Sequence, residues 1–164
     1  MNSTKMSFDF FRNLRTQSAA EFFSDENLNI NAVGEYGRSL LHEAIACRKA
    51  DVAKTLIAKD VLLNLQDSKA QTALHYAAVY SMFETAKLIV EKGGDLNISD
   101  EYGNDPLWTS ALAAKGDYRL VGFLIANGAN PKHKNNVDKS VLDFAKQSNN
   151  LELWTVCGGS KNEF

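Results

Sequence analysis

A six-residue segment recurs along this 164-residue chain at a constant spacing, and no other feature constrains the fold as strongly. Residues 39–44 read Ser-Leu-Leu-His-Glu-Ala, residues 72–77 read Thr-Ala-Leu-His-Tyr-Ala, and residues 105–110 read Asp-Pro-Leu-Trp-Thr-Ser, a step of 33 both times. The asparagines that close these units keep the same step: Asn31, Asn64 and Asn97. A period of about 20–50 residues is typical of a chain built from stacked structural units.

The period lengthens once, toward the C-terminus. Leu142 follows Leu107 by 35 residues, and Gly128 follows Gly93 by 35. Two residues have therefore been inserted in the third of these units. Residues 112–117 are the predicted place, because the turn glycine comes two residues late there.

The ends of the chain resemble degenerate copies of the same unit. Counting backwards places Phe8 at the Leu41 position and Phe11 at the Ala44 position, while Phe10 and the segment 151–154 add large apolar side chains near the ends. We therefore predict one domain over residues 1–164, with capping units at both ends. The predicted units are 6–33, 34–66, 67–99, 100–134 and 135–157.

Each unit is expected to hold two helices. A Ser or Thr whose hydroxyl can cap a helix opens the first one, and Leu74, Ala77 and Ala78 then lie at i, i+3 and i+4 on one apolar face. Residues 56–57 and 89–90 supply the apolar stripe of the second helices. One unit cannot bury both apolar faces alone, so neighbours must stack and share a continuous core. The predicted fold is an all-α solenoid of about five units joined by polar hairpin loops, with free tails at residues 1–5 and 158–164.

The repeated segments resemble the ankyrin-repeat family. Leu-His-x-Ala occurs twice, at 41–44 and 74–77, and Gly-Gly-Asp-Leu-Asn at 93–97 and Gly-Ala-Asn at 128–130 are similar to the way the family's units end. The resemblance covers roughly residues 27–149. It implies an α-solenoid that binds other proteins through its hairpin tips and the concave face of its first helices, without catalysis.

Several positions depart from the family pattern. Other residues replace the motif proline, the loop glycine, the late glycine and the motif histidine. These are, in that order, Leu40 and Ala73; Ala70 and Asp138; Asp60; and Trp108 and Asp143. We expect the affected loops to be less regular than in a standard unit.

The histidines are the obvious candidates for catalysis, and we favour a structural role for them. The resemblance implies that His42 and His75 hydrogen-bond the loop backbone, and the recurrence of a histidine at one position per unit agrees with that role. Ala46 occupies the position at which a second zinc ligand would be needed after His42-Glu43, and phosphate-binding, dinucleotide-binding and nucleophile-elbow motifs are absent. We expect His133 to be solvated, and His75→Ala to lower the free energy of unfolding by roughly 1 to 3 kcal/mol.

Composition limits the remaining possibilities. Eighteen Lys and Arg against 20 Asp and Glu give a net charge of −2, which favours neither nucleic acid nor an acidic membrane surface as partner. Cys47 and Cys157 are too few for a disulfide framework, and we read both as bystander thiols in a reducing, cytoplasmic compartment. Asp95, Asp100, Glu101 and Asp105 form an acidic cluster that we read as a solvated face. No cofactor and no metal site is predicted.

Large side chains at positions without a structural role are the candidates for partner binding, because interfaces favour Tyr, Trp and Arg. At the predicted hairpin tips these are Glu35, Tyr36, Arg38, Lys69, Gln71, Glu101, Tyr102 and Asn104. On the first helices they are Glu43, Tyr76, Tyr80, Trp108, Thr109 and Leu112, with Phe144 beside them. The alternative for a single member such as Tyr76 or Phe144 is simple packing against a neighbouring helix.

The function that fits best is a monomeric, non-catalytic module that binds and blocks one protein partner. The favoured specialisation is an immunity protein that neutralises a bacterial toxin, with acidic tips suited to a basic partner such as a nuclease. The alternative is a regulatory inhibitor or adaptor of a kinase or transcription factor. A hydrolase built on Cys47 or a histidine is the least favoured possibility, since no residue is placed by sequence to activate the thiol.

Overall fold

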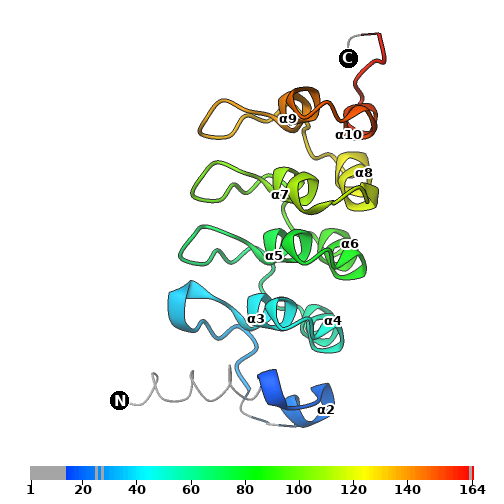
Figure 1. Cartoon of the computed structure of the whole chain (residues 1–164). Coiled ribbons are helices and arrows are strands. Elements are labelled where there is room, and N and C mark those ends of the chain that lie inside the picture. Colours follow the sequence, from blue (N-terminus) through cyan, green and yellow to red (C-terminus); the bar gives the residue numbers. More distant parts are fainter. Residues whose placement is uncertain (1–13, 25, 27, 163) are drawn as a thin grey trace.

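The computed structural model describes residues 14–24, 26, 28–162 and 164, and within these the chain is a helical solenoid (Figure 1). Four helix pairs stack in chain order, with one short helix before them. The elements are α2 (Ala19–Phe22), η1 (Glu35–Gly37), α3 (Leu40–Ala46), α4 (Ala50–Ala58), α5 (Ala73–Val79), α6 (Phe83–Glu91), α7 (Pro106–Ala113), α8 (Arg119–Ala126), α9 (Val141–Gln147) and α10 (Leu151–Val156). The predicted all-α solenoid is confirmed, and the described β pairing is a single bridge between Val33 and Ser39.

The residue in front of each first helix explains where that helix begins. Ser39, Thr72, Asp105 and Ser140 stand at these positions with extended backbone. Asp105 Oδ1, for example, accepts a hydrogen bond from Trp108 N at 2.7 Å. Such a cap satisfies a backbone donor that has no partner within the helix.

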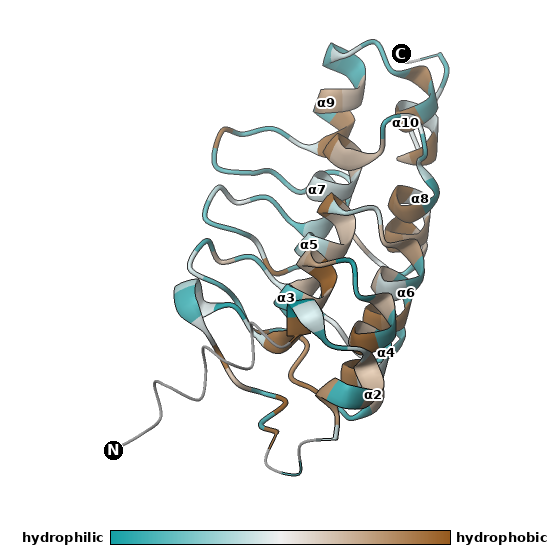
Figure 2. Cartoon of the chain, turned by 60° about the horizontal axis from the view of Figure 1, so that its bottom comes forward, coloured by the Kyte–Doolittle hydropathy of each residue, from teal (hydrophilic) through white to brown (hydrophobic). Residues whose placement is uncertain are grey.

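The core runs between the two columns of helices without interruption. The repeated leucines Leu41, Leu74 and Leu107 are at most 1% exposed. Ala44 and Ala77 are completely buried, and their small side chains allow neighbouring first helices to approach closely. Figure 2 shows that most of the apolar residues belong to the helices of the two columns, while the loops are mostly hydrophilic. Each pair therefore covers the apolar flank of the next, as the repeat pattern predicts.

The two-residue insertion lies in the turn between α7 and α8. The turns between α3 and α4 and between α5 and α6 span residues 47–49 and 80–82, whereas the third turn spans residues 114–118. Lys115 and Gly116 both have positive φ there, 47° and 93°. The sequence placed the insertion correctly.

The loops that lack a glycine are as regular as the others, so the expectation of irregular loops was wrong. Ala70, Asp138 and Asp60 take φ values of 57°, 56° and 56°, the left-handed conformation of the glycines that they replace. Asp67 N donates to Gln71 O at 2.9 Å, much as Asp100 N donates to Asn104 O at 2.8 Å. The loop geometry is thus imposed by its hydrogen bonds, at the cost of backbone strain at the substituted positions.

This strain leads to a first prediction. Ala70→Gly should raise the free energy of unfolding by about 1 kcal/mol, because glycine adopts positive φ without a steric penalty. The measurement is urea denaturation followed by circular dichroism. Ala58→Gly in the last turn of α4 is the matched control, and it should destabilise by about 1 kcal/mol because its backbone is helical. A loss of stability in Ala70→Gly would contradict the assignment of strain.

The C-terminal segment packs against the solenoid, so the expectation of a free tail at residues 158–164 was wrong. Trp154 Nε1 donates to Ser160 O at 2.8 Å, and the Phe164 ring lies 5.8 Å from the Trp154 ring. At the other end Leu14 and Phe22 are at most 2% exposed and cover the first helix pair. The predicted cap residues Phe8, Phe10 and Phe11 and the predicted tail 1–5 lie outside the described residues.

Candidate functional site

Polar hairpin loops project from the solenoid between one helix pair and the next, on the left of Figure 1. We call them fingers, with tips at residues 35–38, 68–71, 101–104 and 136–139. Three tips are braced by a side chain at their base: Asp67 Oδ1, Asp100 Oδ1 and Asn135 Oδ1 each accept two backbone hydrogen bonds from the tip, at 2.9–3.1 Å. Each of these tips is therefore preformed within its own loop.

Neighbouring tips are also joined to one another by the backbone. Ser68 N donates to Tyr36 O at 2.7 Å, Glu101 N to Lys69 O at 3.0 Å, and Asn136 N to Tyr102 O at 3.0 Å. One hydrogen bond thus recurs between each pair of successive fingers. The four tips consequently form one connected row instead of four independent loops.

The outermost side chains of this row are Tyr36, Lys69, Tyr102 and Val137, which we call the finger row. Tyr36 is 67% exposed, Tyr102 61% and Val137 71%. Val137 was not among the binding residues predicted from the sequence. The signal was available, because Val137 lies 35 residues after Tyr102, the same step that the insertion imposes on Leu142.

Two buried histidines link the fingers to the helices. His42 Nε2 lies 3.0 Å from Gln71 O, and His75 Nε2 lies 3.1 Å from Asn104 O. A carbonyl oxygen only accepts, so Nε2 carries the hydrogen, and Nδ1 of His75 accepts from Thr72 N at 3.1 Å. Burial lowers the pKa of both imidazoles. Both histidines therefore use both ring nitrogens, Nδ1 at the start of their own helix and Nε2 toward the next finger, as expected of a structural role.

The third histidine is not solvated as we expected. His133 Nε2 lies 3.0 Å from Gly103 O in the preceding finger, and the residue is half-buried. Asn135 Nδ2 donates to Asn104 Oδ1 at 2.9 Å across the same junction. These contacts lie at the junction after Trp108, which replaces the repeated histidine. The sequence revealed that Trp108 replaces the histidine but not these replacement contacts, because His133 and Asn135 lie in the next finger and not on the first helix.

Two predicted binding residues of the first helices are engaged within the protein. Glu43 is only 6% exposed, and its carboxylate pairs with Arg38 at 3.0 Å and with Arg15 at 3.4 Å. Tyr76 is half-buried, and its hydroxyl donates to Asp67 Oδ2 at 2.8 Å. Burial raises the pKa of the Tyr76 phenol, with the Asp67 carboxylate adding to the rise. Within the fold, Glu43 thus positions Arg38, and Tyr76 contacts Asp67 at the base of the finger.

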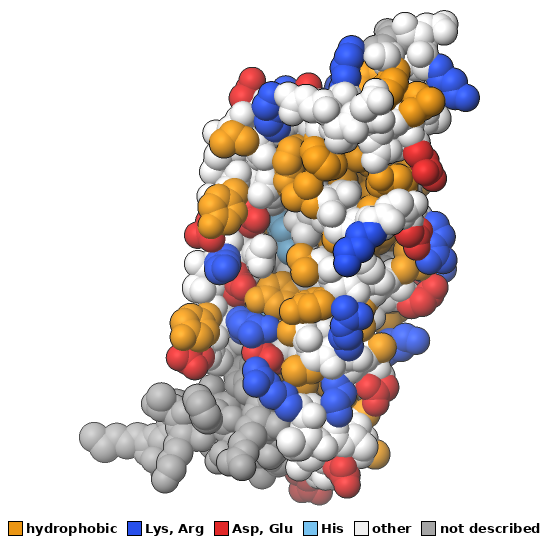
Figure 3. Space-filling model, in the orientation of Figure 1, with side chains coloured by type: hydrophobic (Ala, Val, Ile, Leu, Met, Phe, Trp, Pro, Cys, Tyr) orange, Lys and Arg blue, Asp and Glu red, His pale blue; other side chains and the backbone are white. Residues whose placement is uncertain are grey.

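The first helices also present apolar side chains beside the fingers. Leu112 on α7 is 55% exposed and Val79 on α5 is 49% exposed. Trp108 and Phe144 are half-buried, with ring centroids 5.9 Å apart. Figure 3 shows hydrophobic side chains both at the tips and over the first helices on the same face of the molecule. We call the finger row together with Val79, Trp108, Leu112 and Phe144 the binding face.

The remaining predicted tip and helix residues differ in exposure and in the hydrogen bonds that they make within the fold. Glu35 and Glu101 are exposed, whereas Gln71 and Asn104 contribute their backbone carbonyls to the histidine bonds described above. Thr109 is half-buried and its hydroxyl donates to Asp105 O at 3.2 Å. Part of the predicted set is thus engaged in polar contacts of the fold. The exposed members of the predicted set are Glu35, Tyr36, Lys69, Glu101, Tyr102 and Leu112.

The acidic cluster does not form a solvated face. Asp100 is 9% exposed and accepts backbone hydrogen bonds in its finger, and Asp105 is 4% exposed and caps α7. Burial raises the pKa of Asp105. Of the four residues, Asp95 and Glu101 remain exposed. The tips therefore lack the concentrated negative charge that a basic partner would require.

Both thiols lie at the ends of helices. Cys47 is half-buried at the end of α3, and no disulfide joins it to Cys157. Cys157 directly follows the last residue of α10 and is buried, and burial raises the pKa of this thiol to about 11. A thiol with a raised pKa is a poor nucleophile at neutral pH.

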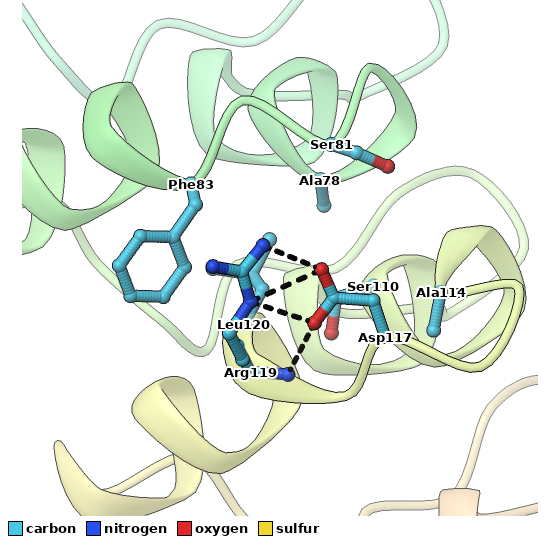
Figure 4. A pocket seen from close by; sticks show the side chains of 8 residues that line it. All are labelled: Ala78, Ser81, Phe83, Ser110, Ala114, Asp117, Arg119 and Leu120. Atoms are coloured by element: carbon cyan, nitrogen blue, oxygen red, sulfur yellow. Dashed lines mark hydrogen bonds and ion pairs between the residues drawn. The ribbon is translucent and has the colours of Figure 1, made fainter.

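The small cavity of about 90 Å³ beside the inserted turn offers little chemistry (Figure 4). Asp117 and Arg119, which line the cavity, pair with each other, with Arg119 Nη2 2.6 Å from Asp117 Oδ2. The other lining residues include Phe83 and Leu120. Among the described residues no group of three His, Cys, Asp or Glu side chains is arranged to hold a metal ion. No helix in the same part of the chain is both long and apolar enough to cross a membrane.

A column of helix pairs with linked fingers is the architecture of a helical repeat protein. In such a protein the finger tips and the first helices together form one extended, exposed surface. The chain belongs to the ankyrin-repeat family: the family described as ankyrin repeats (3 copies) matches residues 57–135. Ankyrin repeats mediate protein–protein binding, and the family is generally a non-catalytic binding module.

Curated relatives resemble the chain over most of its length. The ankyrin repeat protein L371 of Acanthamoeba polyphaga mimivirus is 26% identical over 85% of this chain and 18% of its own. The NF-kappa-B p105 subunit of Rattus norvegicus is 29% identical over 78% of this chain and 14% of its own. An ankyrin repeat-containing protein of Treponema pallidum is 30% identical over 74% of this chain and 41% of its own. The chain thus spans less than half the length of each of these relatives.

Proposed function

We propose that this chain binds one protein partner across the binding face and acts by covering a surface of that partner. The observation that carries the proposal is the finger row: exposed Tyr36 and Tyr102, with Val137, stand on tips that backbone hydrogen bonds join into one unit. Tyrosines are enriched among the residues that dominate binding energy. A preformed surface also loses little conformational entropy on association.

The engagement of the histidines supports a non-catalytic role. Both ring nitrogens of His42 and His75 are used by the fold, and burial raises the pKa of the Cys157 thiol. A general base needs a ring nitrogen that can reach a substrate proton. We therefore propose that the chain acts by binding alone, with no cofactor.

Site-specific photocrosslinking in cells of the source organism tests the proposal. A photoreactive phenylalanine analogue is placed at Tyr36 or at Tyr102, and at Lys54 on α4 or Glu91 on α6 as exposed controls. We expect one crosslinked species of the same mass from both tip positions and none from the second helices. Crosslinking from Lys54 and Glu91 but not from the tips would place binding on the opposite face and contradict the proposal.

The partner that we favour is an enzyme that the chain inhibits, with a bacterial toxin as the specialised case. The alternative is a kinase or transcription factor that the chain regulates or bridges. The buried positions of Asp100 and Asp105 remove the argument for a basic nuclease, so the toxin hypothesis rests on inhibition alone. The partner that crosslinking identifies is purified free of the chain, and its activity is measured as the chain is added. Complete inhibition at equimolar amounts supports a blocker, and undiminished activity supports an adaptor.

The setting that we propose for this binding is a reducing compartment such as the cytoplasm, with the chain as a monomer. Cys47 and Cys157 are both unpaired, as is usual where thiols stay reduced. Sedimentation of the purified chain over a range of concentrations measures its oligomeric state, and a mass that doubles with concentration would contradict a monomer.

A further inference from the structure

The cavity beside the inserted turn has the lining of a pocket for a side chain. Its volume is about 90 Å³, and it lies where α5 and α7 end, the helices that carry Val79 and Leu112 of the binding face. Its apolar lining residues are Ala78, Phe83, Ala114 and Leu120. Ser81, Asp117 and Arg119 line it as well and are exposed, so a partner can reach it from solvent.

One junction earlier in the solenoid, the chain itself supplies an aromatic ring between the turns. Tyr80 lies in the turn between α5 and α6, and its ring centre is 5.5 Å from the guanidinium carbon of Arg48 in the turn between α3 and α4. Ile45, two residues before the first of these turns, is completely buried. A tyrosine ring held against an arginine thus occupies the space between these two turns.

At the cavity the equivalent residues have small side chains. A step of 33 residues relates Ile45 to Ala78, Arg48 to Ser81, and Tyr80 to Ala113. Ala78 and Ser81 line the cavity directly. Small side chains therefore stand where the previous junction has an isoleucine, an arginine and a tyrosine. The repeat thus indicates which group fits the space: an aromatic ring like that of Tyr80.

Arg119 offers the cation that Arg48 provides at the previous junction. Its guanidinium carbon lies 5.8 Å from the centre of the Phe83 ring, and its side chain is 75% exposed. Asp117 holds this group in place, because Arg119 Nε and Nη2 donate to its carboxylate at 2.9 and 2.6 Å. Figure 4 shows the guanidinium group between Phe83 and Asp117, below Ala78. The ion pair is neutral as a whole, so a bound group is selected by its ring and not by its charge.

We infer that the cavity binds one aromatic side chain of the protein partner, packed against Ala78 and Leu120 with its ring toward Arg119. This inference rests on the proposed function and names the group that anchors the partner. Aromatic residues that fill a pocket dominate the binding energy of many interfaces. A guanidinium group attracts the face of a ring, which an aliphatic side chain lacks. Val79 and Leu112 are 49% and 55% exposed and extend the apolar contact around this anchor.

Titration of the full chain with two amino-acid amides tests the inference before the partner is known. N-acetyl-tyrosinamide carries an aromatic side chain and N-acetyl-leucinamide an aliphatic one, and binding is followed by NMR from the backbone amide shifts of Ser81 and Leu120. We expect saturation with N-acetyl-tyrosinamide at a dissociation constant on the order of 1 mM, as is typical of so small a ligand. N-acetyl-leucinamide should bind about tenfold more weakly, because it makes neither a ring contact with Phe83 nor a cation–π contact with Arg119.

Two variants fill the cavity with side chains that the chain uses one junction earlier. Ala78→Ile introduces the residue type found at position 45, and Ala113→Tyr the residue type found at position 80. The matched controls are Ala58→Ile and Ala126→Tyr, at exposed alanines that end α4 and α8. Each filled variant should weaken binding of N-acetyl-tyrosinamide about tenfold, and neither control should change it. Urea midpoints at or above that of the native chain show that the variants are folded.

The same variants connect the cavity to the partner in cells. Photocrosslinking from the Tyr36 tip is repeated in chains that carry Ala78→Ile, Ala113→Tyr or one of the two controls. The yield of the crosslinked species should fall about tenfold in both filled variants, because a blocked pocket excludes the anchor of the interface. Both controls should keep the native yield.

Equal binding of the two amides, the absence of a saturable shift at Ser81 and Leu120, or a native crosslink yield in both filled variants would overturn the inference. Each of these results leaves the proposed function standing if the tips of the native chain still crosslink a partner. Absence of that crosslink from the native chain instead removes both.

Discussion

His75→Ala is expected to lower the free energy of unfolding by about 3 kcal/mol. The side chain is completely buried, and its removal leaves Thr72 N and Asn104 O without a partner. An unsatisfied buried polar group costs roughly 1–3 kcal/mol, and the cavity left by the ring adds to that loss. The expected value lies at the upper end of the range drawn from the sequence, because the structure shows that two loop anchors are lost together.

The measurement is urea denaturation of the full chain, with His133→Ala as the matched control. His133 is half-buried and its Nε2 lies 3.0 Å from Gly103 O, so its loss should cost less, about 1 kcal/mol. Equal destabilisation by the two substitutions would contradict the assignment of His75 as a buried anchor. Loss of an enzymatic activity in His75→Ala with an unchanged urea midpoint would instead revive a catalytic role.

The repeat made the helices, the core and the position of the insertion predictable. A period of 33 fixes which residues are equivalent, so the buried leucines and alanines of one unit identify those of the next. The resemblance to the ankyrin-repeat family implied the role of His42 and His75 as loop anchors, and their recurrence at one position per unit agreed with it. These features are local to a unit or shared by adjacent units in one register, and the sequence carries them directly.

Contacts between different elements were not predictable in the same way. Glu43 and Arg15 are 28 residues apart, and their ion pair depends on how the capping segment lies against α3. The return of the C-terminal segment onto Trp154 depends likewise on packing that has no counterpart in the repeat. Binding residues were therefore assigned by position alone, and Glu43 was included although its side chain lies beneath two arginines.

Loop regularity was misjudged for a related reason. The absence of glycine at Ala70 and Asp138 suggested local irregularity, because propensity is judged one residue at a time. In the folded chain the Asp or Asn side chain at the base of the finger and the hydrogen bonds between neighbouring tips hold the backbone in place. Ala70 therefore adopts a left-handed conformation. Tertiary hydrogen bonds outweigh about 1 kcal/mol of local strain.

Stability is expected to fall as the pH decreases below about 6.5, and the two buried histidines should cause most of that loss. Burial lowers the pKa of His42 and His75 in the folded chain from 6.5. The unfolded chain therefore binds more protons than the folded chain between the folded pKa and 6.5. Stability is fully present above 6.5 and is lost as the pH falls toward the folded pKa, with a slope of at most about 2.7 kcal/mol per pH unit for two sites.

The charged groups that face these rings act in the same window. Asp67 and Arg38 face His42 with opposite effects on its pKa, and Asp100 and Asp105 raise the pKa of His75 without cancelling the effect of burial. The pKa of Asp105 is itself raised from 3.8 by burial, so its contribution has the opposite sign and stabilises the folded chain as the pH approaches 3.8. The histidine effect is therefore best observed between about pH 5 and 7.

Urea unfolding of the native chain at several pH values across this range measures the slope. In a variant with His42→Gln and His75→Gln the slope should largely disappear, because the amide side chains bind no proton there and still offer a donor to the loop carbonyls. His133→Gln serves as the control and should keep most of the slope. If the double variant retained the native slope, the acid sensitivity would belong to other groups, and the neutral, doubly bonded state assigned to the two buried imidazoles would be wrong.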